Sequence, residues 1–140
     1  MAAWVYAVRL EDGSLIWKAP NGEGPGGAGF TSHPVLVGDV VVFGRQNSQV
    51  EAWDVNGSGR VWTWDVPSGV TDLVARGPFV YSTQGFIVIG DAGGNVRWRY
   101  GSSGYFRGNV AEDGMIYLLY AGPMLGHGTF IQAIRPPISP

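Results

Sequence analysis

The chain has 140 residues, of which 45% are hydrophobic, 13% aromatic and 14% charged, and its formal net charge is −2. This length allows one domain with a substantial core, and the apolar content argues against a disordered chain. The nine Lys and Arg residues are scattered and form no basic face, so we do not expect the protein to bind nucleic acid. No apolar run is long enough for a membrane span. The sequence contains no Cys, which excludes disulfides and Cys-based zinc sites.

Short apolar runs rich in Val and aromatic residues, separated by Gly-containing turns, predict an all-β protein of about thirteen strands. Residues 5–17 form the first unit, which is a strand, a turn and a short strand that ends in Trp. Residues 35–64 contain four apolar runs and predict a complete four-stranded antiparallel meander. Residues 71–98 predict a second meander, and residues 108–134 predict three further strands. Surface loops are expected at residues 18–31 and 122–128.

The strands repeat along the sequence. Ala7, Ala52, Val88 and Ala133 occupy matching positions, at spacings of 45, 36 and 45 residues. A period near 40 residues with four strands per period is typical of β-propeller blades. We therefore expect one partial β-propeller domain over residues 1–140, an incomplete ring of about three to three and a half blades. The blade pieces are expected at about residues 4–18, 32–66, 70–100 and 106–134.

One turn has the residue pattern of a calcium-binding loop. Asp54, Asn56 and Ser58 alternate ahead of Gly59, and Asp65 falls where such a loop places its last carboxylate. The same residue types are also favoured in a hairpin turn. The other copies lack the pattern, and the closing residue is Asp where Glu is usual. Calcium bound by Asp54, Asn56, Ser58 and Asp65 is therefore one interpretation and a plain turn is the other.

We expect no catalytic residue and no organic cofactor. His33 and His127 are the only histidines, and neither has Cys, Glu or a second His at ligand spacing. No phosphate-binding glycine loop or nucleophile elbow is present. Trp residues close the outer strands, and we expect them to pack between adjacent blades, with an exposed platform for sugars or peptides as the alternative. These residues are Trp17, Trp62 or Trp64, and Trp98.

Three copies of this pattern resemble the repeat of pyrroloquinoline-quinone-type (PQQ-like) β-propellers. The matching residues are Val5-Tyr6-Ala7-Val8 with Asp12-Gly13 and Ile16-Trp17, then Ala52-Trp53-Asp54 with Gly59 and Val61-Trp62, and then Asp91, Gly94 and Trp98. The resemblance covers roughly residues 4–134 and implies the propeller fold. Members of this family include quinoprotein alcohol dehydrogenases, outer-membrane assembly scaffolds and extracellular sensor domains of bacterial kinases. The resemblance favours an extracellular or periplasmic location, although the sequence shows no signal peptide.

The dehydrogenase branch of the family carries a vicinal Cys pair, and this sequence has no Cys, so a quinoprotein fragment is disfavoured. We expect a non-catalytic structural or protein-interaction module. Three or so blades are fewer than a closed propeller needs. Flanking sequence or pairing with a second copy could complete the ring, or a terminal strand could enter a neighbouring copy and build a filament. The alternative function is an extracellular ligand-sensing or carbohydrate- or peptide-binding domain.

Overall fold

A computed structural model describes residues 5–19, 29, 32–46, 48–67, 72–83, 85–101, 106–120 and 130–139. All regular structure in these residues is β, which confirms the expected class, and none of them belongs to a helix that could cross a membrane. The thirteen described strands are β1 (Val5–Val8), β2 (Leu15–Ala19), β3 (Val35–Val37), β4 (Val40–Arg45), β5 (Gln49–Asp54), β6 (Arg60–Asp65), β7 (Leu73–Arg76), β8 (Phe79–Ser82), β9 (Phe86–Asp91), β10 (Val96–Gly101), β11 (Phe106–Val110), β12 (Ile116–Tyr120) and β13 (Phe130–Ile134).

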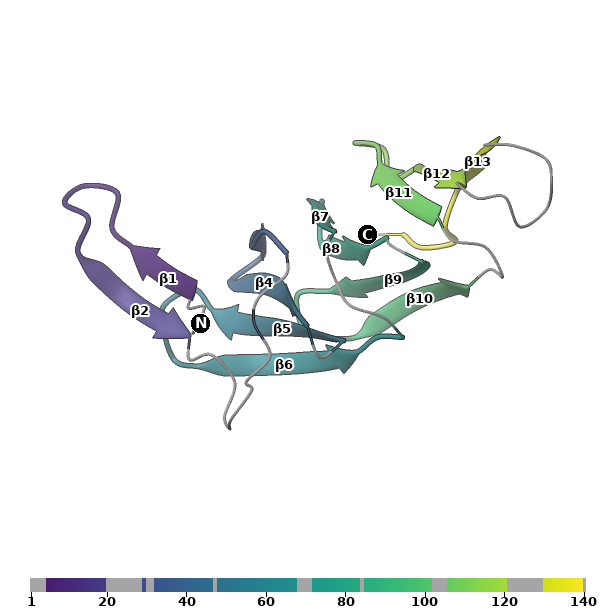
Figure 1. The fold of residues 1–140 in the computed structure, drawn as a ribbon. Coiled ribbons are helices and arrows are strands. Elements are labelled where there is room, and N and C mark those ends of the chain that lie inside the picture. The colour runs from purple at the N-terminus through teal and green to yellow at the C-terminus, as the bar shows by residue number, and fades with distance from the viewer. Residues whose placement is uncertain are drawn as a thin grey trace.

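These strands form four antiparallel sheets that follow one another in sequence order (Figure 1). The first sheet is the β1–β2 pair, and the fourth is the three-stranded β11-β12-β13. The second sheet, β3-β4-β5-β6, and the third sheet, β7-β8-β9-β10, are complete four-stranded meanders. Since β3 and β7 are neighbours in space, the first strands of the second and third sheets lie together. The described sheets do not close into a ring, which confirms the incomplete propeller.

The turns after β5 and β9 show why the repeat contains Asp and Gly. The Oδ1 atom of Asp54 accepts a hydrogen bond from the backbone N of Asn56 at 2.7 Å, and Asp91 Oδ1 accepts one from Gly93 N at 3.0 Å. Each turn then needs a left-handed residue, supplied by Gly57 (φ 89°) and Gly94 (φ 88°). The side-chain oxygen therefore takes the place of a backbone acceptor and starts the turn, and glycine completes it.

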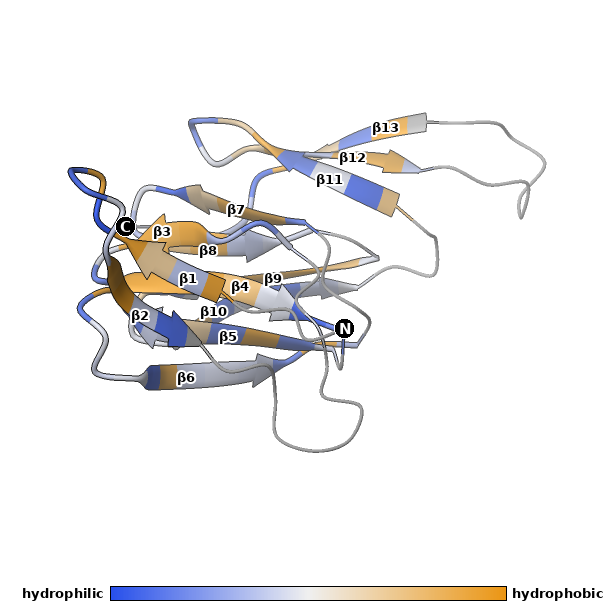
Figure 2. Ribbon diagram, turned by 60° about the vertical axis from the view of Figure 1, so that its left-hand side comes forward, coloured by the Kyte–Doolittle hydropathy of each residue, from blue (hydrophilic) through white to orange (hydrophobic). Residues whose placement is uncertain are grey.

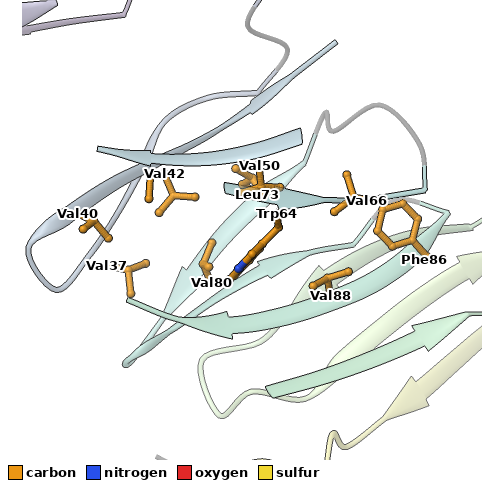
Figure 3. Packing of buried hydrophobic residues seen from close by; sticks show 11 residues of the cluster. Val37, Val40, Val42, Val50, Trp64, Val66, Leu73, Val80, Phe86 and Val88 are labelled. Atoms are coloured by element: carbon orange, nitrogen blue, oxygen red, sulfur yellow. The ribbon is translucent and has the colours of Figure 1, made fainter. Parts of the chain in front are cut away.

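Each sheet buries apolar side chains against the next one. A cluster between the second and third sheets includes Val42, Val50 and Val80, all with 0% exposure, packed around Trp64 (Figure 3). A second cluster, between the third and fourth sheets, includes Ile87, Phe106 and Leu118. Much of the hydrophobic sequence lies on inner strands such as β3 and β4 (Figure 2). Full burial of one such side chain stabilises the fold by about 1.5–3 kcal/mol, so these clusters hold the sheets face to face.

Some boundaries differ from the sequence-based expectation. The strand expected from residue 108 begins at Phe106 and runs through Gly108. A Cβ atom at Gly108 would lie 2.7 Å from Cβ of Thr83, so the glycine marks a close approach between sheets and not a strand start. The loop expected at residues 18–31 is shortened because β2 extends to Ala19. The loop at residues 122–128 lies outside the described residues. Treatment of residues 1–140 as one domain stays a prediction.

Candidate interaction surface

Tryptophan side chains join successive sheets. Trp17 Nε1, on the outer strand of the first sheet, donates a hydrogen bond to the carbonyl oxygen of Val55 at 2.9 Å. Trp62 Nε1, on the outer strand of the second sheet, donates one to the carbonyl oxygen of Ala92 at 2.8 Å. Both acceptors lie in the turn between the third and fourth strands of the next blade. The same contact therefore occurs twice and confirms the packing role predicted for Trp17 and Trp62.

Glycines in the receiving blade make room for these indoles. A Cβ atom at Gly57 would lie 3.0 Å from Cδ1 of Trp17, and one at Gly94 would lie 2.6 Å from Cγ of Trp62. Trp64 packs still closer, because a Cβ at Gly90 would lie 2.1 Å from Cη2 of Trp64. No ordinary Cβ fits at that distance, so the interface requires both the tryptophan of one sheet and the glycine of the next.

The two sides of each sheet can be distinguished by what covers them. We call the side directed toward the next sheet in sequence order the forward face, and the opposite side the reverse face. On β12, Leu118 lies on the reverse face, packs against the third sheet and is 0% exposed. Its neighbours Tyr117 and Leu119 lie on the forward face and are 46% and 45% exposed. Ile131, opposite Leu119 in the register, is 71% exposed. Tyr117, Leu119 and Ile131 form the last end face.

A matching surface lies at the other end of the row. The first sheet packs Ala7 and Trp17 against Trp53 of the second sheet, and its other side exposes Tyr6 (58%), Val8 (56%) and Ile16 (42%). We call these three residues the first end face. Sheets with both sides covered have apolar residues at successive positions, whereas half-exposed strands alternate with polar ones. Residues 116–120 show the first pattern, with apolar or aromatic residues at successive positions. That run was the signal in the sequence for these surfaces, which were not among the predictions above.

The structure separates the residues of the candidate calcium loop. Asp54, Asn56 and Ser58 share the turn after β5, where Asp54 Oδ1 already accepts the Asn56 N–H. Asp65 lies at the opposite end of β6, paired in register with Gln49, and its Oδ1 accepts a hydrogen bond from Gln49 Nε2 at 3.0 Å. Three of the four predicted ligands therefore share one turn and the fourth is a strand length away, so the hairpin interpretation fits this geometry. Calcium binding at the turn stays a prediction.

The two histidines are placed differently. His33 is exposed and lines a cavity of about 260 Å³ beside Asp72, Arg107 and Asn109, at the entrance of the inner strands. Within the described ranges, no three His, Cys, Asp or Glu side chains come together as metal ligands would. His127 lies outside the described residues.

A buried ion pair lies on the reverse face of the second sheet. Arg45 Nε donates to Glu51 Oε2, and the residues are only 4% and 2% exposed. Trp53 Nε1 donates to the other carboxylate oxygen of Glu51, so both oxygens of this acid have partners. A buried charge is costly unless it is paired, so the loss of one partner is strongly destabilising. This pair was not predicted, although two charged residues within otherwise apolar strands were its signal in the sequence.

Comparisons with known proteins agree with this architecture. Residues 2–100 match the family model described as "Outer membrane protein assembly factor BamB". A curated relative from Shewanella oneidensis, also named outer membrane protein assembly factor BamB, is 30% identical over 90 residues. That match takes in 64% of this chain and 21% of the relative, so the chain spans about a fifth of the relative's length.

Solved structures show the same fold at low sequence identity. The crystal structure of BamB from Moraxella catarrhalis is 19% identical with a TM-score of 0.59, over 94% of this chain and 44% of that chain. A protein of the mitotic checkpoint complex is 16% identical with a TM-score of 0.65, over 94% of this chain and 46% of that one. The WD40 repeats of RRP9 are 12% identical with a TM-score of 0.64, over 92% and 44% of the two proteins. With the family match over most of its length, the chain belongs to the BamB family of PQQ-like β-propeller repeats.

Proposed function

We propose that this protein is a non-catalytic structural and protein-interaction module whose end faces dock further blades of the same repeat type. The single observation that carries the proposal is the exposure of the last end face. Its residues Tyr117 and Leu119 are about half exposed, whereas Phe79 and Tyr81 on the forward face of the third sheet are 6% and 2% exposed. An apolar face that is buried in one blade and bare in the next is suited to receive a neighbour.

The relatives support a protein-interaction role. The Shewanella oneidensis protein is named as an assembly factor for outer membrane proteins, which is a task carried out on other proteins. The docking blades would come either from flanking sequence of a longer polypeptide or from a second copy. In both cases the contact would repeat the internal one, with apolar side chains of one sheet covered by the next.

The mass of the protein in solution, measured by sedimentation over a range of concentrations, tests whether a second copy supplies the cover. Self-assembly predicts a mass that is a multiple of 15.0 kDa. The variant Leu119→Asp places a charge in the last end face and should return the particle to a monomer. Val96→Asp is the matched control, because Val96 is 36% exposed but lies on β10 of the third sheet.

A monomer at every concentration would rule out self-assembly and leave flanking blades as the cover. Binding of an apolar dye then decides the broader proposal. The wild-type monomer should bind the dye and Leu119→Asp should bind less of it, since the end face is bare. A monomer whose dye binding is unchanged by Leu119→Asp would contradict the end-face proposal.

A further inference from the structure

A cavity of about 240 Å³ opens where the third and fourth sheets meet. Three segments form its wall: the ends of β7 and β8 with the turn between them, the turn between β11 and β12, and the tail that follows β13. Pro136 in the tail is buried, and Ile138 packs on the cluster between the third and fourth sheets. The tail is therefore a fixed part of the wall, and all the lining residues belong to the described part of the protein.

Arg76 contributes a guanidinium group that is half buried. Its Nη1 donates to the carbonyl oxygen of Ala75 at 2.9 Å. Its Nε is buried and has no hydrogen-bond partner, and none of the ion pairs among the described residues includes Arg76. A buried donor without a partner costs about 1–3 kcal/mol, and a turn of the guanidinium toward an acceptor in the cavity would recover a stabilising interaction.

Tyr81 adds a second donor to the same wall. The residue is 2% exposed, and its hydroxyl has no hydrogen-bond partner among the described residues. A Cβ atom at Gly114 would lie 3.4 Å from that oxygen, so the glycine leaves the hydroxyl uncovered. Burial raises the pKa of Tyr81, and the positive charge of Arg76 opposes this rise. The hydroxyl is thus protonated at neutral pH and can donate to an acceptor.

Arg135 brings a second guanidinium to the rim of the cavity. Its Nη2 lies 3.4 Å from Oδ2 of Asp113, and the two side chains are 61% and 62% exposed. Such an exposed pair is weak and rearranges easily, so Arg135 can turn toward a ligand. Glu112 and Asp113 are the carboxylates at this rim, and they place two negative charges near the entrance.

We propose that this cavity binds a single carboxylate group of a peptide, either an acidic side chain or the free carboxyl terminus. The planar guanidinium of Arg76 matches the two oxygens of a carboxylate, and the Tyr81 hydroxyl adds a further donor. Glu112 and Asp113 repel an anion with two charges more than an anion with one, which favours a carboxylate over phosphate. The Phe79 ring and Pro78 in the wall offer apolar contact for the rest of the peptide.

This site is separate from the two end faces, so the inference does not depend on the assembly proposed above. The cavity wall is formed by the ends of β7 and β8, the two turns and the tail, and it includes none of the residues of the two end faces. A protein that stays monomeric should bind the carboxylate as well as an assembled one does.

Titration of the 140-residue protein, followed by the NMR shifts of the Gly77 and Gly114 amides, tests the proposal. The probes are acetyl-Gly-Glu-Gly-amide with a side-chain carboxylate, acetyl-Gly-Gly-Phe with a free carboxyl terminus, and acetyl-Gly-Gln-Gly-amide as the neutral control. At least one carboxylate probe should shift both amides at millimolar concentration, and the neutral probe should not. The stronger carboxylate probe identifies the source of the group.

Three variants separate the site from general effects. Arg76→Met should weaken binding about tenfold or more, and Tyr81→Phe should weaken it about threefold, since each removes a donor. Arg99→Met is the matched control, because Arg99 is exposed on β10, away from the cavity, and should bind as the wild type does. If Arg76→Met does not fold, Tyr81→Phe alone decides. Equal binding of the neutral probe, unchanged binding in Tyr81→Phe, tighter binding of inorganic phosphate, or no shift with either carboxylate probe would overturn the proposal.

Discussion

The forward face of the third sheet is covered by another sheet and that of the fourth sheet is exposed, although both carry similar apolar and aromatic side chains. On β8, Phe79 and Tyr81 are buried because the fourth sheet packs on them. On β12, Tyr117 and Leu119 are exposed, with no described strand on that side. Both strands have apolar or aromatic residues at nearly every position, which is the pattern of sheets covered on two sides. The exposure of a blade is thus set by its neighbour and not by its own strands.

The contact between the second and third sheets shows what a completed interface contains. Trp64 packs against Gly90 and donates a hydrogen bond to the carbonyl oxygen of Gly94 at 2.8 Å, while Trp62 stacks on Trp64 with ring centroids 4.4 Å apart. On the third sheet, Trp98 stacks on Tyr100 at 5.7 Å, and no described turn of the fourth sheet accepts its indole N–H. The tryptophan is present in both places, but in the fourth sheet the described residues after β13, 135–139, form a tail and not a turn between two strands.

The largest effect is expected from removing the indole of the completed interface. Trp64→Ala should lower the free energy of unfolding by about 3–5 kcal/mol, because it leaves a cavity between two sheets and removes the hydrogen bond to the partly buried carbonyl of Gly94. Urea unfolding followed by circular dichroism measures this change. Trp98→Ala is the comparison and should cost clearly less, since Trp98 is only partly buried. Equal losses in the two variants would contradict the distinction between an indole held by the turn of the next sheet and one without such a turn.

Two adjacent leucines on β12 test the faces of a single strand. Leu118→Ala should cost about 2–5 kcal/mol of unfolding free energy, because the side chain is fully buried against the third sheet. Leu119→Ala should change this free energy by no more than about 0.5 kcal/mol, since the side chain is on the open face. The measurement requires a dilute sample, so that self-association does not cover the last end face. A large loss in Leu119→Ala at low concentration would show that this face is already covered within one molecule.

Two glycine-to-alanine substitutions test how closely the sheets pack, and they should change the stability in opposite directions. Gly90→Ala should cost about 1–3 kcal/mol of stability, because its Cβ overlaps the Trp64 ring and the sheets must shift. Gly101→Ala has nothing within 4 Å of the added Cβ and should be neutral or stabilise the strand by up to about 1 kcal/mol. Thermal or urea unfolding of the two variants checks the difference. Gly90→Ala as stable as Gly101→Ala would mean that Trp64 is not held against the third sheet.

The strands and their order could be predicted from the sequence because each blade is a local meander with Gly turns. The second meander, expected over residues 71–98, is found at β7 to β10, and the three strands expected over residues 108–134 are found at β11 to β13. The packing of Trp17 and Trp62 was also predictable, because an indole at the end of each outer strand repeats with the blade period. The strand order depends on residues close together in the sequence, and the tryptophan contacts depend on the regular repeat of the blades.

Features that join distant segments could not be predicted. The cavity beside Arg76 combines three segments, and no spacing in the sequence connects Arg76 with Arg135. Asp65 shows the same limit, because the spacing of the calcium pattern did not reveal that a strand places this residue at the other end of the sheet from Asp54. Gly108 was read as the start of a strand, although it marks a contact with Thr83 from the previous sheet.

The smallest expected effect compares two Asp turns, one that receives tryptophans and one that does not. Asp91 starts the turn whose carbonyls accept the bonds of Trp62 and Trp64, whereas Asp12 starts the exposed turn of the first hairpin. Partial burial raises the pKa of Asp91, but hydrogen bonds from Asn95, Arg97 and Gly93 outweigh it, so the pKa lies below the usual 3.8. The backbone N–H of Ser14 likewise lowers the pKa of Asp12.

A carboxylate whose pKa is lower in the folded protein stabilises the fold above its unfolded pKa, and this contribution disappears as the pH falls through the folded value. Asp91→Asn should therefore be less stable than the wild type at pH 7, and the difference should shrink as the pH falls through the pKa that Asp91 has in the folded protein. Asp12→Asn should follow the same pH dependence with a smaller difference, because no indole bonds to its turn. Urea unfolding across this pH range measures both variants. Equal differences at pH 7 would show that the Asp91 turn contributes nothing to the docking of Trp62 and Trp64.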